Sequence, residues 1–302
     1  MNRQKPLALR VFWGLLATAI ALAVAFWASE KLFPGATSAV GSLLKAGTKI
    51  TPQIESQLFS LKIVQAIQTL SIFLVPAVAV LWAMYGRRGM ALSLTTRVSA
   101  MDMVNIFFLI VFSNTILYVV AQYSQLIPWP QKWITSNETS QKLTEMLLSG
   151  KTYADFGLNL FVVAVIPAFA EEFFFRGFLQ RLSMKWIRDP HISIFLVSVL
   201  FSAIHFDPVM FIPRFLLGAM LGYLYYWSCS LWLPMLAHFL NNGQYVLASF
   251  LLAKKGGQVG VADQASELTV GNFYLLMSVM AVGLILFSIY FRNMNVKFMR
   301  QS

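Results

Sequence analysis

Two adjacent carboxylates and two histidines lie at the ends of apolar runs or inside them. Glu171 and Glu172 follow the uncharged segment 156–170, whereas His205 and His238 belong to later apolar segments. An ionisable group in or near hydrocarbon costs about 2.5–3.5 kcal/mol on insertion scales, so each such group marks a candidate functional site. The sequence therefore directs attention to these four side chains first.

These residue types support the activation of a water molecule. A carboxylate partly removed from water can act as a general base near neutral pH, and a nearby histidine can help to hold and deprotonate the water. A second histidine and an amide can donate hydrogen bonds to a developing oxyanion. His238 and Asn242 lie four residues apart and therefore share one helix face. The set Glu171, His205, His238 and Asn242 thus predicts a site that hydrolyses an amide bond.

The same four side chains could instead bind a metal. Glu171, His205, His238 and Asn242 offer nitrogen and oxygen ligands to zinc or another divalent cation. The chain contains no HExxH, no GxSxG and no glycine-rich phosphate loop, so the familiar soluble hydrolase and nucleotide-binding signatures are absent. Its single cysteine, Cys229, excludes an internal disulfide and a cysteine-rich metal site.

The two glutamates are expected to differ in role. Glu172 and Arg176 are an i,i+4 pair and can form an ion pair, so we assign both to structural support. Glu171 points about 100° away on the same helix and is free to face a cavity. A turn near residue 188 would place Glu171 and His205 at matching distances before and after it, about 25 Å at 1.5 Å per residue. Two antiparallel helices would then hold them at one level.

The elements that must hold these residues read as membrane spans. The chain has 302 residues, of which 58% are hydrophobic and 12% are charged, whereas a soluble domain carries about 25% charged residues. Apolar stretches near 20 residues are long enough to cross a bilayer. We predict an all-α polytopic membrane protein with one membrane domain, 1–302, and a catalytic core at about 150–250. The eight predicted spans are 8–28, 63–85, 103–123, 154–175, 191–207, 209–228, 231–253 and 270–291.

The net charge of +11 is explained by topology. With the amino terminus inside, basic residues greatly outnumber acids in the inner segments but not in the outer ones, as the positive-inside rule requires. An even number of spans returns both termini to the cytoplasm. We therefore predict an integral membrane protein whose partners are membrane lipid and a protein or peptide substrate, with no nucleic acid.

Two further segments carry expectations about local structure. Residues 136–150 are expected to form a short helix on the outer membrane surface, with Ser136 or Asn137 as its cap. Gly218 and Gly222 form a GxxxG spacing that permits close helix approach, and we interpret it as a packing feature.

The segment after His205 leaves alternatives open. Asp207 precedes a proline, so either the fifth span ends near the level of the site, or a short irregular segment carries the chain to the outer face. Arg214, inside the sixth span, either reaches the outer surface or pairs with a buried acid or a substrate carboxylate.

The three spaced motifs resemble those of a known family. They read EExxxR, FxxxH and HxxxN in this order, on three predicted spans. The residues that carry the pattern are Glu171, Glu172, Arg176, Phe201, His205, His238 and Asn242. Over about 150–250 the chain resembles the type II CAAX prenyl endopeptidase family, also called CPBP or Abi intramembrane proteases.

This resemblance implies an all-helical bundle with a cavity that opens to the cytoplasm. It implies an endopeptidase in which Glu171 and His205 activate water, while His238 and Asn242 stabilise the oxyanion and Arg176 supports the glutamate pair. The family has been described both as metalloproteases and as metal-independent glutamate proteases. We favour the second description, with zinc bound by the four proposed catalytic residues as the alternative.

The resemblance also bears on substrate and location. Eukaryotic members cut prenylated CAAX proteins, and many bacterial members are linked to bacteriocin maturation or self-immunity. The compact loops favour a bacterial inner membrane, which disfavours a prenylated substrate. The expected substrate is a membrane-associated or lipidated protein or peptide. Two other functions stay open: a non-proteolytic self-immunity or scaffold protein that keeps the motifs for folding, and a proton- or ion-coupled transporter. The second is disfavoured because the sequence shows no inverted repeat.

Overall fold

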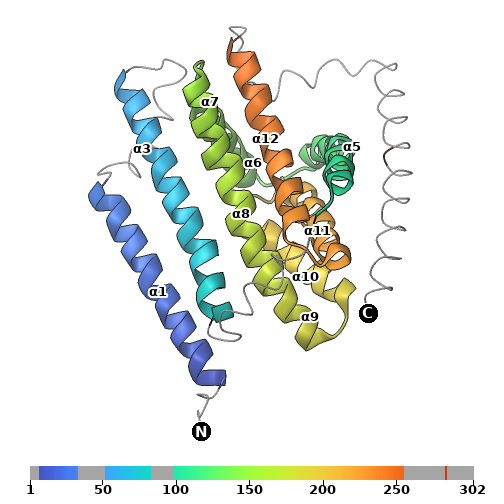
Figure 1. Cartoon of the computed structure of the whole chain (residues 1–302). Helices are drawn as coiled ribbons and strands as arrows, with labels where there is room; N and C mark the ends of the chain where they lie inside the picture. Colours follow the sequence, from blue (N-terminus) through green and yellow to red (C-terminus); the bar gives the residue numbers. More distant parts are fainter. Residues whose placement is uncertain (1–6, 33–51, 83–97, 255–282, 284–302) are drawn as a thin grey trace.

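A computed structural model describes residues 7–32, 52–82, 98–254 and 283, and within these ranges every regular element is a helix (Figure 1). Three of the elements, named η, are π-helical. The elements in chain order are α1 (Leu7–Leu32), α3 (Pro52–Thr69), η1 (Leu70–Leu74), α5 (Ala100–Gln125), α6 (Gln131–Leu148), α7 (Tyr153–Asn159), η2 (Leu160–Val165), α8 (Ile166–Glu172), η3 (Phe173–Gln180), α9 (Arg181–Ile187), α10 (Pro190–Ala203), α11 (Phe211–Ser228) and α12 (Trp232–Lys254).

The predicted all-α class is confirmed for the described residues, together with helices of the membrane-spanning kind. Three helices in these ranges are long and apolar enough to cross a membrane: Gln57–Trp82, Ala100–Gln125 and Tyr153–Ile187. The predicted span 270–291 lies outside the described residues, apart from position 283. The number of eight spans therefore stays a prediction.

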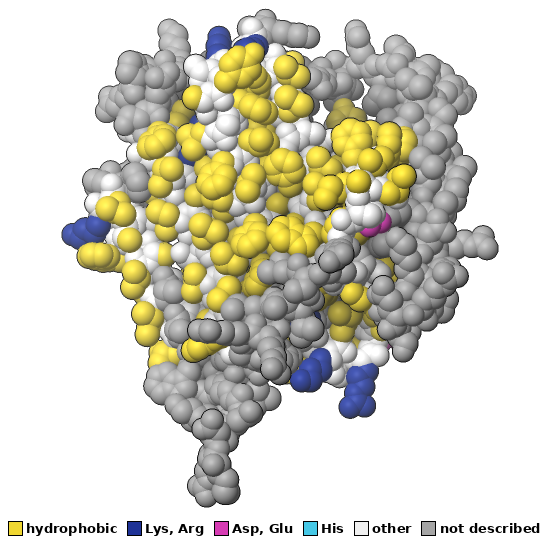
Figure 2. Space-filling model, viewed as in Figure 1, with side chains coloured by type: hydrophobic (Ala, Val, Ile, Leu, Met, Phe, Trp, Pro, Cys, Tyr) yellow, Lys and Arg dark blue, Asp and Glu magenta, His cyan; other side chains and the backbone are white. Residues whose placement is uncertain are grey.

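Hydrophobic side chains cover much of the face shown in Figure 2, while the lysines and arginines visible there lie at its edges. Helix α10 also has apolar side chains on its outer surface, because Phe195, Leu196 and Leu200 are 55%, 43% and 48% exposed. A water-soluble bundle would place polar residues on such a face. The distribution is the one expected of helices that lie in lipid.

The long helix Tyr153–Ile187 contains α7, η2, α8, η3 and α9 without a break. It ends where Arg188 adopts a left-handed conformation, with φ of 61°. The Asp189 carboxylate then accepts a hydrogen bond from the Ile192 N–H at 2.9 Å and caps α10. The predicted turn near residue 188 is confirmed, and the helix that carries the glutamate pair continues past the predicted end of its span at residue 175.

Two π-helical segments flank the glutamate pair, and the sequence did not predict them. A π-helical turn accommodates an extra residue, shifts the backbone bonding pattern, and is frequent at functional sites. Glu171 and Glu172 are the last two residues of the short α8, which lies between η2 and η3. The orientation of the two carboxylates is therefore set by interruptions of the regular helix on both sides.

The GxxxG pair on α11 allows close approach of η3 and α10, as predicted. Arg176 Nη2 donates to the Gly218 carbonyl at 2.8 Å, and Gln180 Nε2 donates to the Gly222 carbonyl at 2.9 Å. A Cβ atom on Gly222 would lie 2.9 Å from Ile194 Cγ2. Two polar side chains four residues apart thus bind two carbonyls four residues apart, which fixes the depth of α11 against the long helix.

Replacing Gly222 with alanine is expected to lower the stability of the protein by about 1–3 kcal/mol, because the added methyl group overpacks the contact with α10. Gly157→Ala is the matched control, since no heavy atom lies within 4 Å of its added Cβ. Alanine favours a helix over glycine by about 1 kcal/mol, so the control should be neutral or slightly stabilising. Thermal unfolding in detergent measures both changes, and equal midpoints would contradict the expected contact.

Helix α6 begins earlier than predicted. It starts at Gln131 after Pro130, so Ser136 and Asn137 lie within it and neither caps it. The predicted cap was wrong because the helix already begins one to two turns earlier, and the Asn137 side chain has other partners. Asn137 Oδ1 accepts from Gln141 Nε2 at 2.9 Å, one turn along the helix. Its amide nitrogen points to the segment that follows α10, as described below.

Candidate active site

Glu172 is the centre of a buried polar cluster. Its Oε1 atom accepts hydrogen bonds from Arg176 Nη1 and from His238 Nδ1, both at 2.8 Å. Glu172 and Arg176 are 0% exposed, and His238 is 3% exposed. The predicted i,i+4 ion pair is present. A buried carboxylate needs such donors, because an unpaired charge in this environment would be strongly destabilising.

The bond between Glu172 and His238 orients the imidazole. With Nδ1–H donated to the carboxylate, Nε2 of His238 is left free to accept or donate a proton towards the site. Sequence reasoning missed this contact, since the two residues are 66 positions apart and no periodicity links them. The sequence contained one indication of this contact. Two acids, Glu171 and Glu172, accompany a single arginine, Arg176, so a buried carboxylate there needs a further hydrogen-bond donor from another helix.

The ring of Phe201 brings the two histidines together. Its centroid lies 5.3 Å from that of His205 and 6.0 Å from that of His238, with both rings edge-on. Arg176 Cζ lies 4.9 Å from the same centroid, and Phe175 packs at 5.1 Å. Phe175 and Phe201, which are in contact, lie at equal sequence distances before and after the turn at 188. The antiparallel register that the sequence predicted is therefore present at this level.

His205 lies just beyond the end of α10. The predicted fifth span, 191–207, is too long, because the helix ends at Ala203. A residue before proline disfavours helical backbone, and Asp207 occupies that position. His205 is exposed, and its Nδ1 atom lies 2.7 Å from the Phe201 carbonyl oxygen. Since a carbonyl can only accept, Nδ1 carries the proton and Nε2 is the free nitrogen.

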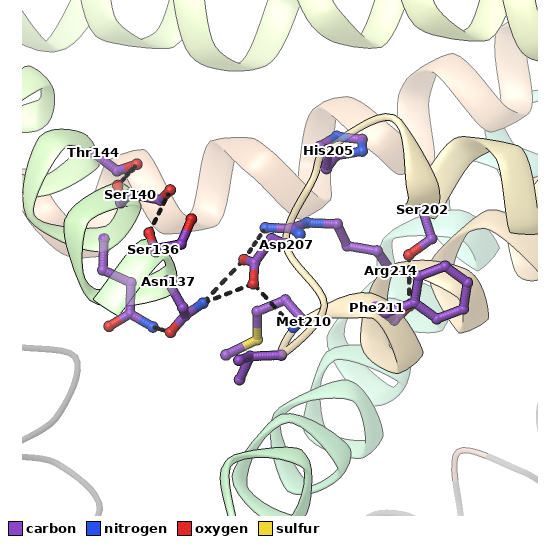
Figure 3. A network of polar contacts seen from close by, with 12 residues as sticks. Ser136, Asn137, Ser140, Thr144, Ser202, His205, Asp207, Met210, Phe211 and Arg214 are labelled. Atoms are coloured by element: carbon purple, nitrogen blue, oxygen red, sulfur yellow. Dashed lines mark hydrogen bonds and ion pairs between the residues drawn. The ribbon is translucent and has the colours of Figure 1, made fainter. Parts of the chain in front are cut away.

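Asp207 holds the irregular segment 204–210 in place (Figure 3). Its two carboxylate oxygens lie 3.1 and 3.0 Å from Asn137 Nδ2. The same carboxylate accepts from Arg214 Nη2 at 3.0 Å and from the Met210 N–H at 3.3 Å. Irregular backbone at membrane depth is tolerated where protein buries it, and here Asp207 is only 7% exposed. Of the alternatives for Arg214, pairing with a buried acid is the one observed.

Removing the Asn137 amide is expected to loosen this segment. Asn137→Ala leaves the buried Asp207 carboxylate with fewer donors, at a cost of about 1–3 kcal/mol. Each 1.4 kcal/mol corresponds to a tenfold change in an equilibrium constant. Backbone amides of 204–210 should therefore exchange hydrogen about 10–100 times faster, as measured by mass spectrometry. Ser136→Ala, at the exposed neighbouring position, is the control. Equal exchange in both variants would show that α6 does not hold the segment.

The other two predicted site residues differ in how far they are engaged. Asn242 Nδ2 donates to the Val163 carbonyl of η2 at 3.1 Å, and its Oδ1 atom accepts from Asn241 at 3.0 Å. One amide N–H of Asn242 therefore remains. Glu171 is 8% exposed and makes no hydrogen bond with another described residue. Its carboxylate interacts electrostatically with Glu172, Arg176, Arg214 and His238.

The structure thus brings several of the predicted residues together, at the Glu172 carboxylate and at the Phe201 ring. His238, Glu172 and Arg176 are bonded directly, while His205 joins them through the Phe201 ring. Within the described part of the chain, no hydrogen bond links Glu171, His205, His238 and Asn242 to one another.

The zinc alternative is not supported by this arrangement. Among the described residues, no three His, Cys, Asp or Glu side chains come together in a way that could hold a metal ion. The amide of Asn242 is also engaged with Val163 and Asn241. The residues do not form a ready metal site, and no chemical step below uses one.

Comparison with known proteins identifies one segment of the chain. Residues 154–244 match the family model of the type II CAAX prenyl endopeptidase Rce1-like proteins, so this segment is an Rce1-like domain. A protein of Bacillus subtilis strain 168, described as uncharacterized protein YpbD, is 34% identical over 91 residues. That alignment covers 29% of this chain and 43% of the relative's length. No solved structure gives a significant match. The matched segment contains all three motifs, whereas α6 with its Asn137 lies outside it.

Proposed function

We propose that this protein is a membrane endopeptidase that hydrolyses a peptide bond with water activated by Glu171. The proposal rests on one observation. Glu172, Arg176 and His238 form a buried hydrogen-bonded cluster, and the neighbouring Glu171 carboxylate has no hydrogen-bond partner among the described residues. Glu172 is held by two hydrogen bonds to its Oε1 atom, whereas Glu171 is available. The Rce1-like domain at 154–244 supports the same reaction class.

In the proposed reaction, Glu171 and Nε2 of His205 hold the attacking water. Glu171 takes a proton as the oxygen of the water bonds to the carbonyl carbon of the substrate. The electron pair of the C=O bond moves to the carbonyl oxygen. As the C–N bond breaks, the oxyanion re-forms the C=O bond and Glu171 returns the proton to the leaving nitrogen. The products are a carboxylic acid and an amine, and the acid proton then passes to the amine, giving a carboxylate and an ammonium group.

His238 and Asn242 are proposed to stabilise the oxyanion. Asn242 retains one amide N–H for this purpose. His238 already donates Nδ1–H to Glu172, so Nε2 can donate only when the imidazole is doubly protonated. The Glu172 carboxylate balances that imidazolium charge. Glu172 is thus proposed to orient and stabilise the His238 imidazolium, and Arg176 is proposed to hold the Glu172 carboxylate in place.

The substrate class follows from the setting of the site. Apolar side chains on the outer faces of the helices suit a site that receives a membrane-associated or lipidated protein or peptide. The proposed location is a bacterial inner membrane, with both termini in the cytoplasm. In Figure 1 the start of α1 and the turn between α9 and α10 lie at the same end of the molecule, which fits this topology.

The test is peptide hydrolysis by the purified full-length protein in detergent. Internally quenched peptides, with and without a farnesylated cysteine, are incubated in ¹⁸O-water and their products are weighed by mass spectrometry. Hydrolysis should place one ¹⁸O atom in each new carboxylate. A double variant, Glu171→Gln with His205→Ala, purified in the same way, controls for contaminating proteases.

A second arm adds a strong chelator to the wild-type protein. Unchanged cleavage is expected if glutamate alone activates the water. Products of equal amount from the wild type and the double variant would defeat the endopeptidase assignment. A non-proteolytic scaffold or immunity protein would then be the better description.

A further inference from the structure

Arg214 has an unused donor, although its side chain as a whole is 29% exposed. Its Nη2 atom donates to Asp207 Oδ2 at 3.0 Å, whereas its Nη1 atom is buried and has no hydrogen-bond partner. Arg176, the other arginine beside the site, has both terminal nitrogens bonded, to Glu172 and to the Gly218 carbonyl. Buried polar groups in native proteins are nearly always paired, so an unpaired guanidinium nitrogen requires an explanation.

The guanidinium of Arg214 is held in a fixed place. Asp207, its ion-pair partner, is itself bonded to Asn137 on α6 and to the Met210 N–H. Figure 3 shows the arginine side chain extending from α11 towards Asp207, beneath the segment that carries His205. A donor fixed in this way needs no reorganisation when charge develops next to it, which is the requirement for electrostatic catalysis.

The charge of Arg214 acts on the two residues proposed to activate water. Its partner Asp207 lies only two residues after His205, and the guanidinium is near enough to Glu171 and His205 for the charges to influence one another. The donors already assigned to the oxyanion are both partly used, because His238 donates to Glu172 and Asn242 donates to Val163. A further donor in this place would therefore have a chemical task.

We propose that Arg214 Nη1 donates a hydrogen bond to the carbonyl oxygen of the scissile peptide bond and stabilises the oxyanion. This role rests on the proposed endopeptidase function and adds a catalytic residue to it. As Glu171 takes the proton from water, one negative charge moves from its carboxylate to the substrate oxygen. The total charge of the site does not change, and Arg214 faces the negative charge before and after the step.

Charge also decides against the nearest alternative, a subsite for a substrate carboxylate. When ionised, Glu171, Glu172 and Asp207 carry three negative charges, which the positive charges of Arg176, Arg214 and a doubly protonated His238 balance. A permanent substrate anion would leave the site with a net negative charge. A developing oxyanion only relocates a charge that is already present.

The test uses Arg214→Ala, assayed with the peptide that the wild type cleaves. Loss of one oxyanion donor reduces kcat by about 10²–10³-fold in other hydrolases, and the same range is expected here with KM changed by less than about threefold. Added guanidinium chloride at millimolar concentration should restore part of kcat. It should not restore Glu171→Gln, because that variant lacks the base. Arg214→Lys is the second variant if the alanine variant does not fold.

The outcomes separate the proposals. Cleavage by wild type with full kcat in Arg214→Ala overturns the role of Arg214 and leaves the endopeptidase intact. If Arg214→Ala instead raises KM and leaves kcat unchanged, the comparison of substrates decides. A rise seen only for peptides with a free carboxyl end and not for amidated ones, or only for peptides with glutamate and not glutamine, assigns Arg214 to a substrate carboxylate. Loss of kcat without guanidinium rescue in a folded variant reduces Arg214 to a structural partner of Asp207. Absence of any wild-type cleavage overturns both proposals.

Discussion

The Glu171→Gln variant should fold normally and lose about 10²–10⁴-fold in kcat, the usual contribution of a general base. Glutamine has nearly the same shape as glutamate, and Glu171 makes no hydrogen bond to a described residue that the change would break. The amide cannot accept a proton from water. We expect KM to change little, because the carboxylate acts on the water and not on the peptide. Steady-state kinetics in detergent give both constants.

Glu172→Gln is the matched control, since it makes the same change one residue away. That carboxylate accepts from Arg176 and His238, and it is 0% exposed. Its replacement leaves the guanidinium without a counter-ion, so the thermal midpoint should fall. Because Glu172 is also proposed to orient His238, kcat should fall in this variant as well, but a lower thermal midpoint is expected only for Glu172→Gln. An unchanged kcat in a folded Glu171→Gln protein would remove this residue from the mechanism and would point to Glu172 or to another base.

Arg176→Met is expected to cause the largest loss of stability, about 3–5 kcal/mol, the usual cost of removing one partner of a buried ion pair. The Arg176 side chain is fully buried and donates both to Glu172 and to the Gly218 carbonyl. Its guanidinium also packs over the Phe201 ring. One substitution therefore leaves a carboxylate and a carbonyl with fewer donors. Unfolding in detergent, followed by circular dichroism, measures the effect.

The double variant Glu172→Gln with Arg176→Met tests the reason for that loss. If the uncompensated charge dominates, removing the carboxylate as well should recover part of the stability, so that the two changes are not additive. Strictly additive effects would mean that packing against Phe201 and the bond to Gly218 matter more than the ion pair. In either case the variant retains Glu171, so residual cleavage can be compared at equal folded concentration.

Contacts within one helix, or across one tight turn, could be predicted from the sequence. The ion pair of Glu172 and Arg176 follows from a spacing of four residues. The contact of Phe175 with Phe201 follows from counting equal numbers of residues before and after the turn at 188. Both depend on the regular rise of a helix. The close approach of α11 at Gly222 was also visible as a small-residue spacing.

Contacts between distant helices could not be predicted in this way. The bonds from His238 to Glu172 and from Asn137 to Asp207 depend on how each helix is rotated about its axis. In a chain whose helices are apolar on nearly every face, hydrophobic periodicity does not determine that rotation. The proline after Asp207 indicated a break, but not that the helix would end at Ala203. That end depends on partners from α6 and α11.

The π-helical segment η2 (Leu160–Val165) has a consequence for changes in chain length. If the same residues formed a regular α-helix, the chain after them would rotate by about 100°, the angle of one residue. Glu171 would then move towards the place that Glu172 holds beside His238. Loss of a single residue from the segment would cancel the rotation and leave both carboxylates where they are. Which of the two acids faces the reaction is therefore coupled to the length of a segment that carries no reactive group.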